Sequence, residues 1–277
     1  MCRHFVSVSL GETRRVVRDL IQLQRDEGFA DGACAVDEVG NPWSTGALNA
    51  EASEGGDVFP DGASFLVLYA HDRLSVAEMS WGYHVEWKRG PLFNTRLESA
   101  LQPTSMWHDS LLHRRCAIPV RAFYESHATE TVRSPRTGKA VKRQYRFARV
   151  WQESDGNLSA GESSACGGED GEIRETEEAT SAFLIAGIYQ DERFSVITTE
   201  PDDVVAPVHN RMPLVLDERA ALTWLDPNSS LEDLVALARA SSVALSAHAD
   251  DPASAEPASS SKPAADKRAS SGQLALF

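Results

Sequence analysis

The sequence predicts an α+β fold with mainly antiparallel strands. Two observations support this prediction: strand-like apolar runs outnumber helix-like ones, and the connections between neighbouring runs are short enough to be hairpins. The chain has 277 residues, of which 42% are hydrophobic and 25% charged, as in an ordinary soluble globular protein. That length allows one large domain with a sizeable core.

The expected strands are short apolar or alternating runs. The clearest pair is 64–70 (SFLVLYA) and 74–81 (LSVAEMSW), joined by the three residues 71–73, which indicate a hairpin. The other expected strands are residues 4–10, 116–125, 144–151, 183–189 and 194–199.

The expected helices show apolar residues at helical spacing. Ser9 followed by Glu12 forms a possible capping box, and Val16, Val17 and Leu20 continue behind it. Residues 218–225 and 231–240 are the other two predicted helices.

Two segments have compositions that cannot bury enough apolar surface to fold. Residues 152–182 are rich in Gly, Ser and Glu, and residues 246–277 begin with an Ala/Ser/Pro-rich stretch. We therefore expect one domain over 1–245 with a disordered acidic insert at 152–182, followed by a disordered tail over 246–277. Residues 49–57 suggest another loose insertion.

Cysteine usage and hydropathy favour a cytoplasmic protein. The four cysteines lie far apart without a Cys-x-x-Cys pair, which argues against a zinc site and against a disulfide scaffold. No apolar run approaches the length of a membrane span, and no secretory signal is evident. We expect a monomer with no metal and no cofactor, associated with the nucleoid.

The net charge of −14 conceals a basic middle. Residues 84–151 carry 13 Lys/Arg and 5 Asp/Glu, whereas residues 152–182 carry 1 and 9. A basic block can follow a phosphate backbone, although a solvated charged surface would have the same composition.

Cys2 becomes the N-terminal residue if Met1 is removed, and it then offers an amine and a thiol on adjacent carbons. The amine can form a Schiff base with an aldehyde, and the thiol can close on it to give a thiazolidine. The thiol could instead attack a carbonyl, as in N-terminal-nucleophile hydrolases. A cysteine near a frayed chain start without any role is the plain alternative.

Four ordered motifs give the sequence a family resemblance. After Cys2 come Trp81-Gly82, then 93–99 (FNTRLES), 114–125 (RRCAIPVRAFYE) and 208–213 (VHNRMP). This order resembles the SRAP family (SOS response-associated peptidase, the abasic-site processing proteins). The resemblance implies a single domain on a mainly antiparallel, barrel-like β-sheet with flanking helices.

The resemblance also implies a function in DNA damage repair. Family members trap abasic sites in single-stranded DNA through a thiazolidine on the N-terminal Cys, and they are credited with removing their own Met1 as a peptidase, with possible lyase activity. On this reading the catalytic residues are Cys2, Asn94 holding it, Glu125 shuttling protons and His209 acting as acid/base on the sugar. The DNA-binding residues are Arg3, His4, Trp81, Arg96 and Arg211.

Two departures concern DNA contact. The family's Cys-Gly-Arg becomes Cys2-Arg3-His4, and the proline usual after the Trp-Gly step is lost from Trp81-Gly82-Tyr83-His84-Val85. A glycine after the nucleophile allows a close backbone approach that Arg3 does not.

Residues 273–277 (QLALF) resemble the peptide that docks bacterial repair proteins on the DNA sliding clamp. Leu274, Leu276 and Phe277 would fill an apolar pocket and Gln273 would bond at its rim. The sliding clamp is therefore an expected partner beside abasic single-stranded DNA; an apolar segment without a role is the alternative.

Two other functions stay open. An N-terminal-Cys amidohydrolase or peptidase would hydrolyse a small amide without DNA. A non-catalytic, clamp-tethered single-stranded-DNA binder would have lost the chemistry through Arg3.

Overall fold

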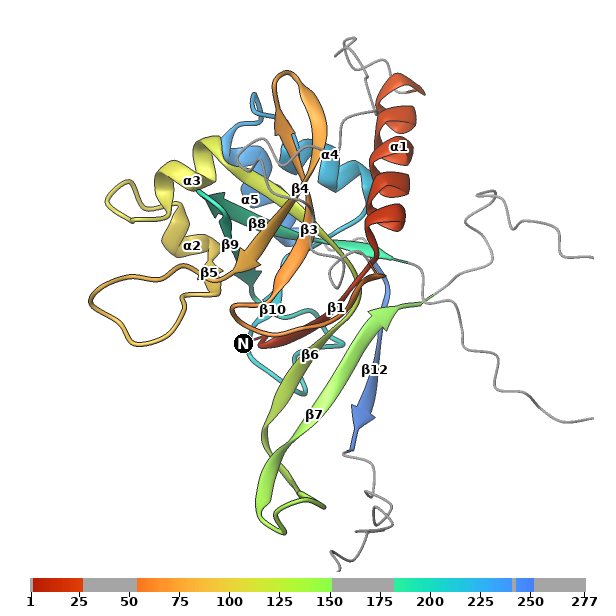
Figure 1. Ribbon diagram of the computed structural model, residues 1–277, viewed down its shortest axis with the longest axis vertical. Coiled ribbons are helices and arrows are strands. Elements are labelled where there is room, and N and C mark those ends of the chain that lie inside the picture. The colour runs from red at the N-terminus through yellow and green to blue at the C-terminus, as the bar shows by residue number, and fades with distance from the viewer. Residues whose placement is uncertain (1, 27–53, 151–181, 241–242, 252–277) are drawn as a thin grey trace, which may run out of the picture.

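The computed structural model describes residues 2–26, 54–150, 182–240 and 243–251. Within these ranges lie five helices and the twelve strands of one sheet (Figure 1). In chain order the elements are β1 His4–Ser7, α1 Leu10–Asp26, β2 Gly56–Val58, β3 Ala63–Ala70, β4 Arg73–Trp81, β5 Asn94–Arg96, α2 Leu97–Ala100, α3 His108–His113, β6 Arg115–Arg133, β7 Ala140–Arg149, β8 Phe183–Gln190, β9 Arg193–Thr199, β10 Met212–Pro213, β11 Val215–Leu216, α4 Glu218–Leu225, α5 Leu231–Arg239 and β12 Leu245–Asp250.

Antiparallel pairing dominates the sheet. The strand order is β11-β8-β9-β4-β3-β6-β1-β2, and a further pairing of β8 with β6 closes a circuit through β9, β4 and β3. In the described chain only β4 and β5 pair in parallel, both with β9. These pairings confirm the α+β class and the mainly antiparallel sheet, while the barrel-like form stays a prediction.

The hairpin predicted around residues 71–73 joins β3 to β4. Ala70 pairs with Arg73, so the turn has two central residues, His71 and Asp72. Both have positive φ, 54° and 59°, which matches the twist of a two-residue hairpin.

The predicted capping box starts α1. The Ser9 backbone N–H donates to the Glu12 carboxylate at 3.0 Å, and the Glu12 N–H donates to Ser9 Oγ at 3.2 Å. The Glu12 carboxylate also pairs with Arg121 of β6. Because Ser9 caps the N-terminus of α1, the first strand ends at Ser7 and not at residue 10 as predicted.

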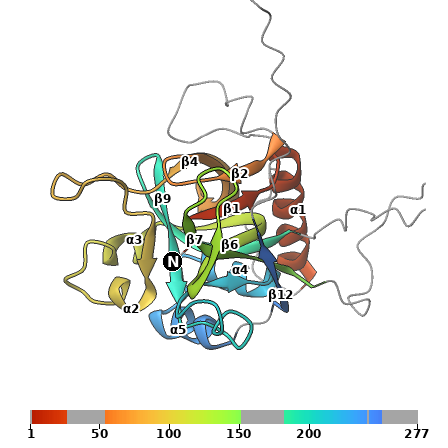
Figure 2. The same ribbon diagram turned by 90° about the horizontal axis from the view of Figure 1, so that it is seen from below.

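The sheet separates two apolar clusters, because successive strand residues point to opposite faces. Phe65 and Val67 of β3 pack with Leu20 of α1 and Trp224 of α4 on one face. Leu66 and the neighbouring apolar residues of the other face form a second cluster that also contains Cys2, Trp81 and Phe194. Figure 2 shows α1 and α4 against the sheet. The candidate nucleophile therefore belongs to the cluster on the face of the sheet opposite α1 and α4.

Several strand bounds differ from the prediction: β7 starts at Ala140 and not at residue 144, and β12 was not predicted as a strand. Strand β6 runs on to Arg133, eight residues past the predicted end, and pairs with β7. Residues 246–250, which composition placed in a disordered tail, instead belong to β12, where Ser246 pairs with Ala148 of β7. The assignment of residues 246–250 to the tail is therefore wrong.

Other predicted segments lie partly or wholly outside the described residues. The acidic insert, apart from residue 182, and the motif at 273–277 fall outside them, as do Trp151 and residues 49–53. Of the expected loose insertion at 49–57, residues 56 and 57 belong to β2. No helix within the described ranges is long and apolar enough to cross a membrane.

Candidate active site

Cys2 lies two residues before β1, in the apolar cluster that also contains Trp81 and Phe194. Its side chain is fully buried. Asn94, the first residue of β5, donates its Nδ2 hydrogen to the Cys2 carbonyl at 2.6 Å. This bond joins residues 92 positions apart and fixes the backbone of the candidate nucleophile.

Pairing between β1 and β6 brings Glu125 beside Cys2. His4 lies opposite Tyr124 in the register, so the residue that follows Tyr124 reaches the backbone just before β1. The two groups lie close enough for the Glu125 charge to help raise the pKa of the Cys2 thiol. Two predicted catalytic residues thus meet through the pairing of these two strands.

Burial sets the protonation state of both groups. Burial raises the pKa of the Cys2 thiol to about 12, and the nearby Glu125 charge acts in the same direction. The thiol donates to the His4 carbonyl with Sγ···O at 3.3 Å. The resting thiol is therefore neutral at physiological pH and needs a base before it acts as a nucleophile.

Glu125 has the properties of a proton carrier. Its side chain is 2% exposed, and burial raises the pKa of its carboxyl group from 4.5 to about 7. A group with this pKa both holds and releases a proton near neutral pH, which suits general acid–base work.

His209 lies in the loop between β9 and β10. His209 Nδ1 lies 3.1 Å from the Arg211 backbone nitrogen and 3.2 Å from the Arg211 carbonyl oxygen, so either neutral tautomer of the ring has a partner on Arg211. Partial burial lowers the pKa of the imidazole. The Ala128 N–H donates to the Val208 carbonyl at 3.0 Å and ties this loop to β6, the strand that carries Glu125.

Arg211 links the loop that carries His209 to α2 and β9. It is 9% exposed, and its two terminal nitrogens bind the Glu98 carboxylate at 2.8 and 2.9 Å. One of them also donates to the Thr198 carbonyl at 2.7 Å. Because these partners occupy both terminal nitrogens, the structure gives Arg211 a positioning role; contact with DNA by Arg211 stays a prediction.

Trp81 does not reach the surface. It is 0% exposed, its indole N–H donates to the Phe93 carbonyl at 2.7 Å, and its ring packs against Phe5 and Phe194. The expected DNA contact by Trp81 is therefore wrong, because the Trp-Gly motif serves the core. Gly82 beside it has φ 113°, and a Cβ there would lie 2.5 Å from Pro91.

The remaining predicted DNA-binding residues lie at the surface. Arg3 and Arg96 are exposed, and the His4 side chain is 15% exposed. The His4 ring stacks between Phe59 and Tyr124, with centroids at 4.4 and 4.1 Å, and its Nε2 lies 2.8 Å from an Asp57 carboxylate oxygen.

Sequence reasoning missed this aromatic stack beside Cys2. Phe59 is 54% exposed, so a flat hydrophobic surface faces solvent next to the predicted site. Its position just after β2 gives no signal in the sequence, because the β1–β2 pairing alone brings it to His4.

Fold and site together define an α+β domain with a buried cysteine facing a carboxyl group of raised pKa. The family model described as "SOS response associated peptidase (SRAP)" matches residues 36–250. The chain therefore belongs to the SRAP family, although Cys2 itself lies before the matched span.

Distant relatives and solved structures agree with this membership. The abasic site processing protein YoqW of Bacillus subtilis is 20% identical over 172 residues, and YoaM of the same organism is 22% identical over 174. Each match covers 57% of this chain and 60% of the relative, so the chain spans less than two thirds of these relatives.

Two crystal structures share the fold. A protein from Bacteroides thetaiotaomicron and a phage-related protein from Bordetella bronchiseptica both give a TM-score of 0.52 over 90% of this chain. They are 16% and 14% identical to it, with 91% and 93% of their own chains covered.

Proposed function

We propose that this protein processes abasic sites and captures them covalently in single-stranded DNA through Cys2. The observation that carries the proposal is the position of Cys2, held by Asn94 and facing the buried Glu125. The curated relatives are named abasic site processing proteins, which supports the same substrate.

The chemistry needs the free amine of Cys2, exposed by removal of Met1. The amine nitrogen attacks the aldehyde carbon of the ring-opened sugar, and the resulting carbinolamine, once its hydroxyl group is protonated, loses water to form a protonated imine. The Cys2 sulfur then adds to the imine carbon and gives up its proton. One aldehyde, one amine and one thiol yield one thiazolidine and one water.

Glu125 serves two proton transfers in this sequence. Protonated, it donates to the departing hydroxyl of the carbinolamine; ionised, it accepts the proton of the thiol. A pKa of about 7 makes both forms available at neutral pH. The second transfer supplies the base that the buried thiol needs, because its raised pKa keeps it protonated at neutral pH.

His209 opens the sugar. Its Nε2 would move a proton between the ring oxygen and the anomeric hydroxyl, which converts the hemiacetal into the aldehyde. Partial burial lowers the imidazole pKa and keeps the ring neutral at physiological pH, so that it can act as base.

Surface residues around the site would hold the DNA. Arg96 contacts a phosphate, and Arg3 and His4 follow the strand entering the site. The backbone φ of Arg3 does not lie in the positive region that favours glycine. A residue with a side chain therefore fits at this position. This supports the chemistry despite the substitution of the family's glycine.

Further activities and partners are proposed from membership of the SRAP family and from the motif at residues 273–277. We propose self-removal of Met1 as a peptidase activity, a possible lyase activity, and docking of Gln273, Leu274, Leu276 and Phe277 on the sliding clamp. The protein would act as a monomer at the nucleoid, in the cytoplasm, without a metal or cofactor.

Denaturing electrophoresis of protein mixed with an abasic single-stranded oligonucleotide tests the proposal. The wild type should give an adduct that survives denaturation, and Cys2→Ala should give none. Cys166→Ser is the matched control, since it removes a thiol from the acidic insert, and it should crosslink like the wild type. An adduct of normal yield with Cys2→Ala would refute the proposal, and hydrolysis of small amides without adduct would favour an amidohydrolase.

A further inference from the structure

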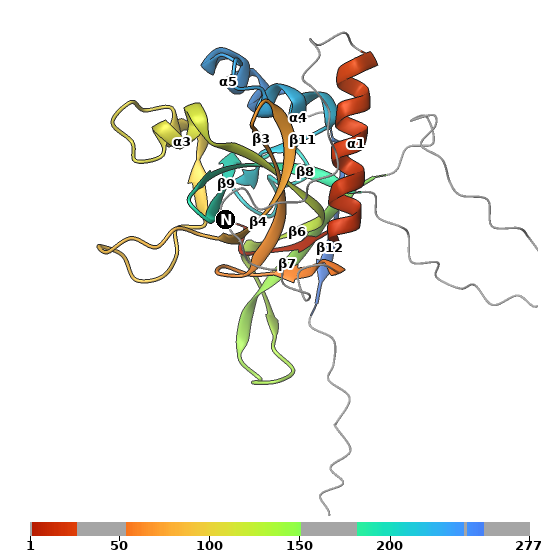
Figure 3. The ribbon, with the colours of Figure 1, turned by 45° about the horizontal axis from the view of Figure 1, so that its top comes forward.

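The distal part of the β6–β7 hairpin, residues 126–144, extends away from the body of the domain. We call it the arm. Figures 1 and 3 both show it projecting on the side away from α4 and α5. A strand pair that leaves the core gains little from apolar burial, so its presence calls for another explanation.

The arm is strongly basic. It contains five Lys/Arg and one acidic residue, Glu130. Four of its cations, Arg133, Arg136, Lys139 and Lys142, are exposed. In the part of the chain that the structure describes, no carboxylate forms an ion pair with any of these four. They are therefore available to a phosphate backbone.

A bulge with a fixed geometry sets the direction of the arm. Ser126 pairs with Gln144 and Thr131 with Lys142, so four residues of β6 bulge where β7 has one. Inside the bulge, His127 Nδ1 accepts the N–H groups of Thr129 and Glu130 at 3.2 and 2.9 Å.

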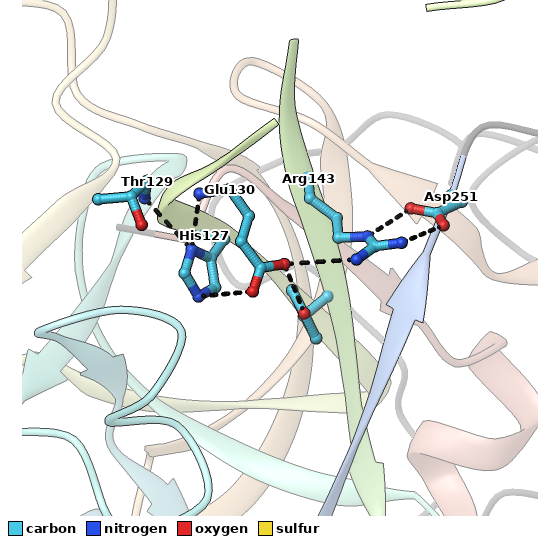
Figure 4. A network of polar contacts seen from close by, with 6 residues as sticks. His127, Thr129, Glu130, Arg143 and Asp251 are labelled. Carbon is cyan, nitrogen blue, oxygen red and sulfur yellow. Dashed lines mark hydrogen bonds and ion pairs between the residues drawn. The ribbon is translucent and has the colours of Figure 1, made fainter. Parts of the chain in front are cut away.

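An ion-pair network joins the bulge to Asp251, the residue that follows β12 (Figure 4). The Glu130 carboxylate accepts from Tyr145 Oη at 2.9 Å and lies 3.4 Å from Arg143. Arg143 in turn binds both carboxylate oxygens of Asp251, at 2.7 and 2.6 Å. The network therefore links β6, β7 and the residue that follows β12 at the base of the arm.

The arm starts at the candidate active site. Glu125 immediately precedes it on β6, and its Ala128 is bonded to the loop of His209. The charge of Lys142 contributes to lowering the pKa of His209, so this cation acts across the site. A DNA strand that leaves the candidate active site on this side would therefore meet the arm.

We propose that the arm is a track for the phosphate backbone of the DNA strand on one side of the abasic site. On β7, the arm residues from Gln144 to Ala140 span about 14 Å at ~3.4 Å per residue, which matches about four stacked nucleotides at ~3.4 Å each. The inference deepens the proposed function and rests on it for the identity of the strand.

The test compares two variants with equal loss of charge. Arg133, Arg136 and Lys139 are replaced by Gln in the arm variant; Lys142 is kept because it acts on His209. The control variant replaces the exposed Arg14, Arg15 and Arg18 of α1 by Gln. Binding is measured over a salt series with an oligonucleotide carrying an unreactive tetrahydrofuran abasic analogue, with flanks of about three or about twelve nucleotides, shorter and longer than the arm.

The arm variant should bind the long oligonucleotide roughly tenfold more weakly at low salt, with its log–log salt slope reduced by about 2 for three lost phosphate contacts. It should match the wild type on the short oligonucleotide, and its crosslinking rate at saturating abasic DNA should be unchanged. Equal binding of the long oligonucleotide by arm variant and wild type would overturn the inference. So would an equal loss in the α1 variant, or a loss that persists on the short oligonucleotide.

Failure of the proposed function has a different signature. If no protein forms an adduct but the arm variant still loses affinity only on the long oligonucleotide, the covalent chemistry is wrong and the arm is supported.

Discussion

Glu125→Gln isolates the titration of the one buried carboxyl group beside Cys2. The substitution keeps the shape of the side chain and removes its charge. Burial raises the pKa of Glu125 from 4.5 to about 7, so the folded protein holds a proton that the unfolded chain releases between these two pH values. Wild-type stability should therefore fall as the pH rises through this window, because the native state binds the extra proton.

The size of the effect follows from the change in pKa. At ~1.36 kcal/mol per pKa unit, a rise from 4.5 to about 7 corresponds to roughly 3 kcal/mol of unfolding free energy lost between pH 4.5 and 8. The Gln variant lacks this component, so the two proteins should differ in stability by about that amount more at pH 8 than at pH 4.5.

Urea denaturation of wild type and Glu125→Gln at pH 4.5, 6 and 8 measures this difference. The variant should gain on the wild type as the pH rises, and its crosslinking should be slower, on the order of 10²-fold, for loss of a positioned acid–base group. Parallel stability curves for the two proteins would refute the reasoning, because they would mean that Glu125 titrates at its ordinary pKa in the folded protein.

Three further experiments test the proposed roles of Asn94, Arg211 and residues 273–277. Asn94→Ala should slow crosslinking and cost about 1–2 kcal/mol of stability, since the buried carbonyl that it holds loses its donor; a normal rate would contradict its role. Arg211→Met should destabilise the fold by about 1–3 kcal/mol, seen by thermal melting, because the buried Thr198 carbonyl loses its donor and the half-exposed Glu98 carboxylate loses its partner; loss of DNA affinity without loss of stability would instead favour direct contact with DNA. A peptide of residues 265–277 should bind purified sliding clamp at about micromolar Kd, and Leu276→Ala with Phe277→Ala should abolish binding; equal binding by both peptides would leave the motif without a role.

Local patterns predicted local structure well. The hairpin at residues 71–73 and the capping box of Ser9 and Glu12 depend on neighbouring residues, and both were predictable from the sequence. Strand β12 was not, because its Ala- and Ser-containing sequence resembles a loose tail and only its pairing with β7 makes it a strand. In such cases tertiary contacts override propensity.

The geometry of the candidate active site also depends on tertiary contacts that the sequence pattern does not reveal. The motifs indicated Asn94 and Glu125, but their meeting at Cys2 depends on pairing across the sheet that no spacing reveals. The burial of Trp81 and the Arg211–Glu98 pair, 113 positions apart, are likewise properties of the folded chain. The family resemblance implied DNA contact for Trp81 and Arg211, and the full burial of Trp81 excludes it for that side chain.

The central claim is that Cys2 forms a thiazolidine with the abasic aldehyde. Tandem mass spectrometry of the protease-digested adduct tests it most directly. We expect a peptide that begins at Cys2 without Met1, carries the sugar remnant on Cys2 and has lost one water relative to its components. The adduct should form without a reducing agent and resist borohydride. An adduct on a lysine, or one stable only after borohydride reduction, would rule out a thiazolidine on Cys2.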